Sequence, residues 1–188
     1  PGAAVRVSAA PEGARPLAVF DIDGVLADVS HRLHFLDVHR WEKFFAAAHA
    51  DPLLDEGADR LRAAQDEYDV VYLTGRPERN RRLTETWLRG FGLPTGPLFM
   101  RPDDDHRPAR YVKREVLRLL AREREIAMIL DDDPAVVRVL EADGWPVELA
   151  TWLPHSSTLQ DAQENSALKV RLQELKVAND NEKALLEQ

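Results

Sequence analysis

The sequence feature that most constrains the fold is a short apolar run that ends in a polar side chain, repeated along the chain. LAVFD at residues 17–21 and IAMILD at 126–131 end in acids, and DVVYLT at 69–74 ends in a hydroxyl. A weaker fourth run is PVELA at 146–150. Continuous apolar runs of this length are typical of strands that are buried on both faces. The runs therefore predict four strands of an interior sheet.

Helical patterns separate these predicted strands. Apolar residues recur at helical spacing over residues 58–68, 78–89, 111–122 and 134–142. Pro134 stands where a helix begins, and Gly144 stands where that helix should end. Strand followed by helix, repeated, predicts an α/β fold with a doubly wound parallel sheet and right-handed crossovers.

The composition divides the chain into three segments. Residues 1–16 are rich in Ala, Pro and Gly without periodicity, which predicts a flexible leader. Residues 17–155 carry the strand and helix patterns and form the predicted domain. Residues 156–188 change to Gln, Glu, Asn, Lys and Leu, which predicts a C-terminal helical tail. Residue 1 is Pro and not Met, so one interpretation is that the chain is a processed or excised piece of a longer protein.

The predicted tail has an apolar seam of only about two repeats. The seam is formed by Leu168, Leu172 and Leu175, and it then meets Asn179 and Glu182. A sustained coiled coil needs a longer seam, so an amphipathic tail is favoured, with a coiled coil as the alternative. We expect this tail to support self-association and to contribute nothing to chemistry.

Composition excludes several classes of protein. The chain has no Cys, which excludes a disulfide scaffold and thiolate metal sites. No apolar run approaches the roughly 18 residues that span a bilayer, and the first 16 residues lack the apolar core of a signal peptide. With 44% hydrophobic and 31% charged residues, the chain has the profile of a folded domain, and we expect it to be cytoplasmic without a membrane partner.

Acidic side chains cluster where the predicted strands end. Asp21 and Asp23 follow the first run, and Asp131, Asp132 and Asp133 follow the third strand of the pattern. The carboxyl ends of parallel strands share one edge of a sheet, where ligands bind. Five carboxylates on one edge repel one another unless a hard cation such as Mg²⁺ compensates them. The alternative, that each acid caps the following helix, is plausible for one acid but not for the whole set.

The segment FDIDGVLAD resembles motif I of the haloacid dehalogenase superfamily, in which an apolar strand is followed by Asp-x-Asp-Gly. The resemblance implies that Asp21 is the nucleophile that attacks phosphorus and that Asp23 is the general acid and base. Gly24 allows the backbone to turn beneath the substrate. A bare DxDG also occurs in calcium loops, but its position directly after a buried strand makes the resemblance specific.

Other residues resemble the remaining motifs of this superfamily in the expected order. Thr74 resembles the hydroxyl that contacts a phosphoryl oxygen, with Gly75 allowing close approach, although a helix cap is an alternative role for Thr74. Lys113 resembles the lysine that neutralises the nucleophile and the phosphoryl group. Asp131 and Asp132 resemble the acid pair of the last motif. The resemblance thus implies a Mg²⁺ site formed by Asp21, Asp23, Asp131 and Asp132.

The stretch between the first motif and the second predicts a small cap. Residues 25–57 are too few for a second domain, and the segment from His31 to His49 has the pattern of one or two helices. We expect a minimal helical cover over an open site, which suits large substrates. Four histidines in this segment have irregular spacing, so solvated or substrate-facing roles are favoured over a transition-metal site.

A narrower resemblance covers about residues 17–153. LTGRPERNRRLTETWL and FMRPDDDHRPARYVKREVL, together with the acidic motifs, are similar to the 3′-phosphatase domain of phage-type polynucleotide kinase-phosphatases. This implies removal of 3′-terminal phosphates from nucleic-acid ends. The chain has no G-x-x-x-x-G-K-[ST] loop, so it carries no kinase of that type. A nucleotidase acting on small molecules is the alternative enzyme, and a non-catalytic binding module is the alternative of another class.

The charge of the chain is unevenly distributed. The net charge is -8, but residues 76–124 hold thirteen basic and seven acidic residues, a local charge of +6. This segment is the candidate for contact with nucleic-acid phosphates. Arg76 follows Thr74 and Gly75 at the rim, so we expect its guanidinium to point to the mouth of the site and bind a phosphate. The alternative for Arg76 is a salt bridge to Glu78 or to a motif acid.

Overall fold

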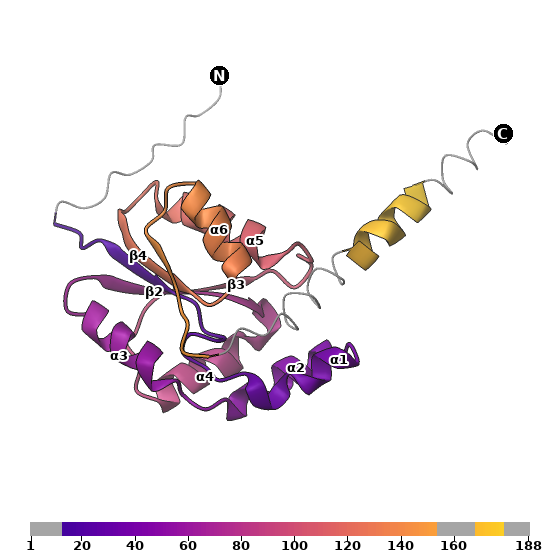
Figure 1. Ribbon diagram of the computed structural model, residues 1–188, viewed down its shortest axis with the longest axis horizontal. Coiled ribbons are helices and arrows are strands. Elements are labelled where there is room, and N and C mark those ends of the chain that lie inside the picture. Colours follow the sequence, from indigo (N-terminus) through magenta and orange to yellow (C-terminus); the bar gives the residue numbers. More distant parts are fainter. Residues whose placement is uncertain (1–12, 154–167, 179–188) are drawn as a thin grey trace, which may run out of the picture.

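The computed structural model describes residues 13–153 and 168–178. Its centre is a parallel five-stranded sheet with the strand order β3-β2-β1-β4-β5 (Figure 1). The strands are β1 Leu17–Phe20, β2 Asp69–Pro77, β3 Leu98–Arg101, β4 Ile126–Asp131 and β5 Val147–Leu149. Val19 of the central strand pairs with Val71 on one side and with Ile129 on the other. The predicted α/β fold class is confirmed.

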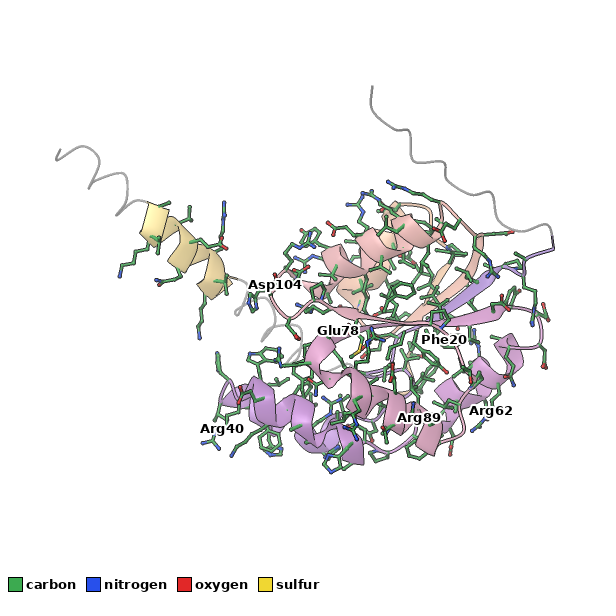
Figure 2. The ribbon with its side chains drawn as sticks, turned by 180° about the vertical axis from the view of Figure 1, so that it is seen from behind. Phe20, Arg40, Arg62, Glu78, Arg89 and Asp104 are labelled. Atoms are coloured by element: carbon green, nitrogen blue, oxygen red, sulfur yellow. The ribbon has the colours of Figure 1, made fainter. Side chains whose placement is uncertain are left out.

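Helices cover both faces of the sheet (Figure 1). The helices on one face are α3 Asp55–Ala64 and α4 Arg81–Gly90, and those on the other are α5 Ala109–Leu120 and α6 Pro134–Ala142. Alternating residues of β1 point to the two faces. Phe20 packs with the core of α3 and α4, as its interior position in Figure 2 illustrates, whereas Val19 packs with that of α5 and α6. Both apolar faces are therefore buried.

The predicted cap is a group of short helices. They are η1 Ser30–Arg32, α1 His34–Asp37, α2 Trp41–Ala46 and η2 Ala47–Ala50, and a further turn, η3 Glu78–Asn80, precedes α4. Leu36, Phe44 and Phe45 form a small separate core beneath them. The cover between β1 and β2 thus consists of short helices, as predicted.

The secondary structure differs from the sequence-based prediction mainly at β3. This strand was not predicted, because only Met100 of its four residues is buried and prolines flank the segment. It lies at the edge of the sheet, where a strand needs no continuous apolar run. The observed bounds of β4 and α6 match the predicted 126–131 and 134–142. Asp133 caps α6 by accepting a hydrogen bond from the Ala135 amide at 2.7 Å.

The predicted leader and tail fall largely outside the described residues. Residues 168–178 of the tail are described and are helical, and the side chains of Leu168, Leu172 and Leu175 are exposed there. The described residues do not test self-association. None of the described helices is long and apolar enough to cross a membrane.

The topology brings the polar strand ends together. From β1 the chain proceeds to β2 and β3 on one side and returns to β4 and β5 on the other, so the order reverses between β1 and β4. Such a reversal opens a crevice at the carboxyl ends of the strands. The chain leaves β1 through a tight turn in which the amides of Leu26 and Ala27 donate to the Ile22 carbonyl and Gly24 has φ of +75°.

Helix α3 packs directly against this turn, and Gly57 permits the contact. A Cβ atom at Gly57 would lie 1.8 Å from the carbonyl oxygen of Val25. Replacing Gly57 by Ala should therefore lower the free energy of unfolding by roughly 1–3 kcal/mol, because backbone must shift to accept the methyl group. Chemical denaturation followed by circular dichroism measures the change.

Gly90 is the matched control for this substitution. It also lies in a helix, but a Cβ atom there would meet nothing within 4 Å. Gly90→Ala should leave stability unchanged or raise it slightly, because Ala favours the helix. Equal stability of the two variants would show that the close approach of α3 to the turn is not needed.

Candidate active site

Asp21 and Lys113 form the centre of the site. Asp21 directly follows β1, and its Oδ1 accepts a hydrogen bond from the Ile22 amide at 2.7 Å. Its Oδ2 lies 2.6 Å from Nζ of Lys113, which is in the first half of α5. The same Nζ lies 2.6 Å from Oδ2 of Asp131 at the end of β4. All three side chains are buried, so one ammonium group joins two strands and a helix.

Asp21, Asp131 and Asp132 form an acidic cluster. Each can offer a carboxylate oxygen that lies within 4.8 Å of the other two. Burial raises the pKa of all three carboxyl groups, and for Asp132 the negative charges of Asp21 and Asp131 raise it further. The positive charge of Lys113 lowers the pKa of each of the three carboxyl groups. One lysine does not compensate three carboxylates, so the donor set fits a divalent hard cation.

Gly24 makes room for this cluster. A Cβ atom at Gly24 would lie 1.9 Å from Oδ2 of Asp132, so the carboxylate lies against the backbone of the turn after β1. The positive φ of Gly24 is also one that side chains of other residues rarely permit. The glycine of the DIDG segment is thus required for two independent reasons.

Thr74 and Gly75 lie on β2, beside β1. The Thr74 hydroxyl oxygen accepts a hydrogen bond from the Arg76 amide at 3.2 Å, which leaves its own proton free to be donated. Thr74 is buried, and Gly75 is partly exposed. Thr74 lies within β2 and caps neither η3 nor α4, so the alternative role as a helix cap is wrong. Its bond to the Arg76 amide is compatible with a contact to a phosphoryl oxygen.

Asp23 belongs to a second network of charges. Its Oδ1 accepts hydrogen bonds from NH2 of Arg32 at 2.7 Å and from NH2 of Arg76 at 2.6 Å. The two guanidinium groups also contact Asp51, whose Oδ2 lies 2.7 Å from Arg32 and 2.8 Å from Arg76. Both arginines and the Asp51 side chain are 0% exposed. Two cations and two anions thus form a neutral buried unit.

Aromatic residues and the cap surround this network. The guanidinium of Arg32 lies 4.2 Å from the centroid of the Phe44 ring, and that of Arg76 lies 5.9 Å from the Trp87 ring. Nε1 of Trp87 donates to the Asp51 carbonyl at 2.9 Å. The network therefore joins the cap helices to β2 and α4.

The structure corrects the predicted position of Arg76. Its guanidinium does not point to the mouth of the site but is fully buried and pairs with the motif acid Asp23. Burial alone would raise the pKa of Asp23, but Arg32 and Arg76 outweigh it and lower that pKa to about 2. The carboxylate of Asp23, which was predicted as a fourth metal ligand, contacts the two arginines and is not among the three carboxylates of the acidic cluster.

Sequence reasoning missed Arg32 and Asp51. Arg32 lies among histidines in a segment that reads as a surface helix, and Asp51 precedes a proline in the connection to α3. No local pattern distinguishes a buried charge from a solvated one. Only the partner across space does so, because a buried charge is stable when it is paired.

Comparisons with known proteins agree with this geometry. Residues 16–148 match the family described as the polynucleotide kinase PNKP phosphatase domain. The chain belongs to this family. It is therefore a phosphatase of the haloacid dehalogenase superfamily, whose enzymes generally use Mg²⁺. No curated protein sequence matches the chain.

Solved structures share the fold of this phosphatase. A chain of the Pnkp1/Rnl/Hen1 RNA repair complex is 24% identical, with a TM-score of 0.62, over 78% of this chain and 46% of that one. A chain of a second Pnkp1/Rnl/Hen1 structure is 22% identical, with a TM-score of 0.63, over 78% of this chain and 50% of that one. A haloacid dehalogenase-like hydrolase from Streptococcus pneumoniae is 13% identical, with a TM-score of 0.55, over 79% of this chain and 91% of that one. The phosphatase spans about half the length of the two repair-complex chains.

The neutral unit of two arginines and two aspartates should stabilise the phosphatase. Replacing Asp51 by Asn leaves two buried guanidinium groups facing one carboxylate, and we expect the free energy of unfolding to fall by about 3 kcal/mol or more. Urea denaturation measures the loss. Asp59→Asn is the control, because Asp59 pairs with Arg62 but its side chain is 78% exposed, so its change should stay below about 0.5 kcal/mol.

Similar losses in the two variants would show that the buried network contributes no more than an exposed ion pair. The measurement needs no substrate and no metal.

Proposed function

We propose that this phosphatase removes 3′-terminal phosphates from nucleic-acid ends through an aspartyl-phosphate on Asp21. The observation that carries the proposal is the Asp21–Lys113–Asp131 arrangement at the carboxyl edge of the sheet, next to the Thr74 hydroxyl. It combines a carboxylate nucleophile, a buried cation that can neutralise a phosphoryl group and a free hydroxyl donor. The family and the +6 segment support a nucleic-acid substrate.

The proposed reaction has two steps. In the first, an Asp21 oxygen attacks phosphorus while the bond from phosphorus to the 3′ oxygen breaks, and Asp23 supplies the proton to the leaving oxygen. In the second, Asp23 accepts a proton from water as that water attacks phosphorus, and the bond to Asp21 breaks. Lys113 and Thr74 hold the phosphoryl oxygens during both steps.

Asp23 must take up a proton before it can act as an acid. With both arginines in contact, its pKa of about 2 keeps it ionised at neutral pH. A substrate phosphate that shared the guanidinium groups of Arg32 and Arg76 would weaken their hold on Asp23 and favour its protonation. Arg76 would then contribute to phosphate binding from a buried position.

Asp21, Asp131 and Asp132 are the residues that would hold Mg²⁺. The ion would neutralise part of the phosphate charge. These three carboxylates and Lys113 leave an excess of negative charge that a divalent cation matches, and the chain offers no thiolate that would favour a softer metal.

Replacing Asp21 by Asn should abolish release of phosphate from a 3′-phosphorylated oligonucleotide, because an amide is a poor nucleophile and cannot form the phosphoenzyme. Inorganic phosphate release measures turnover, and circular dichroism checks the fold. Asp133→Asn is the matched control, because this acid belongs to the same edge but caps α6, and Asn caps equally well.

The choice of substrate separates the candidates. The proposal expects a higher kcat/KM for the 3′-phosphorylated oligonucleotide than for mononucleotides, and the reverse order would identify a nucleotidase. Full turnover by Asp21→Asn would exclude the aspartyl-phosphate mechanism. No turnover of any phosphomonoester by the parent protein would favour a binding module.

Binding of Mg²⁺ should raise the melting temperature of the parent protein, because the ion relieves repulsion among the three carboxylates of the cluster. Removing the ion with a chelator should reverse the rise. Asp132→Asn removes one of the three proposed ligands, and we expect this variant to lose most of the Mg²⁺-dependent shift. If Mg²⁺ raised the melting temperature of Asp132→Asn as much as that of the parent, Asp132 would not be a ligand of the ion. Differential scanning fluorimetry with Mg²⁺ and with Na⁺ at equal ionic strength makes the comparison.

A further inference from the structure

A cavity lies at the same edge of the sheet as the acidic cluster. It has a volume of about 170 Å³, several times the roughly 30 Å³ that a water molecule occupies in the liquid. Its walls include Trp41 and Phe45 from α2 and Pro77 and Arg101 from the ends of β2 and β3. The other lining residues are charged or polar: Arg79, Asp103, Asp105 and His106. Pro77 and Arg101 are paired in the sheet register, so the cavity opens at the same carboxyl edge as Asp21.

Arg101 has hydrogen-bond donors that the described residues leave unused. Its NH1 donates to the Arg107 carbonyl at 2.8 Å and to the Asp105 carbonyl at 3.4 Å. Its Nε and NH2 are buried and have no partner in the described part of the chain. A buried donor without an acceptor costs about 1–3 kcal/mol, and native structures contain few of them.

The acids beside this arginine are engaged elsewhere. Asp103 accepts hydrogen bonds from the Arg79 amide at 3.0 Å and from its guanidinium at 3.3 Å. Asp105 pairs with Arg107, which also pairs with Glu115.

The pKa directions of two neighbouring arginines reflect this difference. Hydrogen bonds to carboxylates raise the pKa of Arg107, whereas burial lowers that of Arg101. Among residues 13–153 and 168–178 no carboxylate bonds Arg101 directly, so its unpaired Nε and NH2 suit an anion.

The sheet sets the distance between this arginine and the nucleophile. β3 lies two strands from β1, and neighbouring strands are about 4.8 Å apart. Arg101 also lies two residues beyond Phe99, which pairs with Leu73 near the level of Asp21, so the two backbones are separated by roughly 12 Å. Phosphates follow one another at about 3.4 Å along a stacked strand and farther apart in an extended one. An anion at Arg101 thus lies within about three backbone linkages of a phosphate at Asp21.

We propose that Arg101 and the cavity beside it bind a backbone phosphodiester of the substrate strand, one to three linkages from the 3′-terminal phosphate. This inference rests on the proposed function and deepens it. The free Nε and NH2 of Arg101 can contact two oxygens of one phosphate, as guanidinium groups commonly do. Trp41 offers an aromatic surface for the adjoining sugar or base. This contact would favour a 3′-phosphate at the end of a nucleic-acid strand over the phosphate of a mononucleotide.

The test removes charge from the substrate and from the protein in turn. The substrates are 3′-phosphorylated oligonucleotides in which each of the last three linkages is replaced, one at a time, by a neutral methylphosphonate. The parent protein should lose about tenfold in kcat/KM at one of these positions, and Arg101→Gln should lose about tenfold on the unmodified strand. The two losses should not add, because they remove the same contact. A mononucleoside 3′-phosphate should be hydrolysed equally by both proteins.

Arg62→Gln is the control for loss of a positive charge, since this exposed arginine lies in the last turn of α3, outside residues 76–124. It should respond to the methylphosphonates as the parent does.

Several outcomes would overturn the inference. Additive losses would mean that the diester and Arg101 act independently. An equal loss on the mononucleotide would show that Arg101 only supports the loop through the Asp105 and Arg107 carbonyls, or that it contacts the terminal phosphate. Insensitivity of the parent to every methylphosphonate would remove the site, while its turnover of the 3′-phosphorylated strand would leave the proposed function intact. If the parent did not turn over the 3′-phosphorylated strand, both the proposed function and the phosphodiester site would be excluded.

Discussion

Compensation of buried negative charge is the constraint on which this structure depends. Five carboxylates gather at the carboxyl edge of the sheet, those of Asp21, Asp23, Asp51, Asp131 and Asp132. Three buried cations partly compensate these negative charges: Lys113, Arg32 and Arg76. The remaining excess of two negative charges equals the charge of one divalent ion. With all five carboxylates ionised, the folded edge carries an excess of negative charge that suits the cation site proposed for it.

The charges are divided into two units with different tasks. Lys113 lies between the carboxylates of Asp21 and Asp131, where we propose the nucleophile and the cation site. Asp23 is held apart from them by the two arginines and Asp51, although it lies only two residues from Asp21. Because of this separation, the two carboxyl groups of one motif have different pKa values. Burial raises the pKa of Asp21, whereas the arginines lower that of Asp23.

Much of the fold was predictable because its elements are locally encoded. Strand β4 is a continuous apolar run, and α6 begins at Pro134 behind the capping side chain of Asp133, so their bounds were predicted. Edge strand β3 was not, because its partly exposed residues carry no continuous apolar signal. The cap helices were expected from their aromatic residues, but the depth at which Arg32 lies beneath them was not.

The sequence by itself determined which chemical groups reach the active edge. Parallel strands end at a common edge, so residues that follow apolar runs, such as Asp21, Thr74 and Asp131, must meet there whatever the details of packing. Only the tertiary structure decided how the charges pair. Arg76 turned inward to Asp23, and Asp51 joined it from a distant connection, because desolvation makes the free energy of a buried charge depend on what lies within a few ångströms in space. Distance along the chain does not encode that neighbourhood.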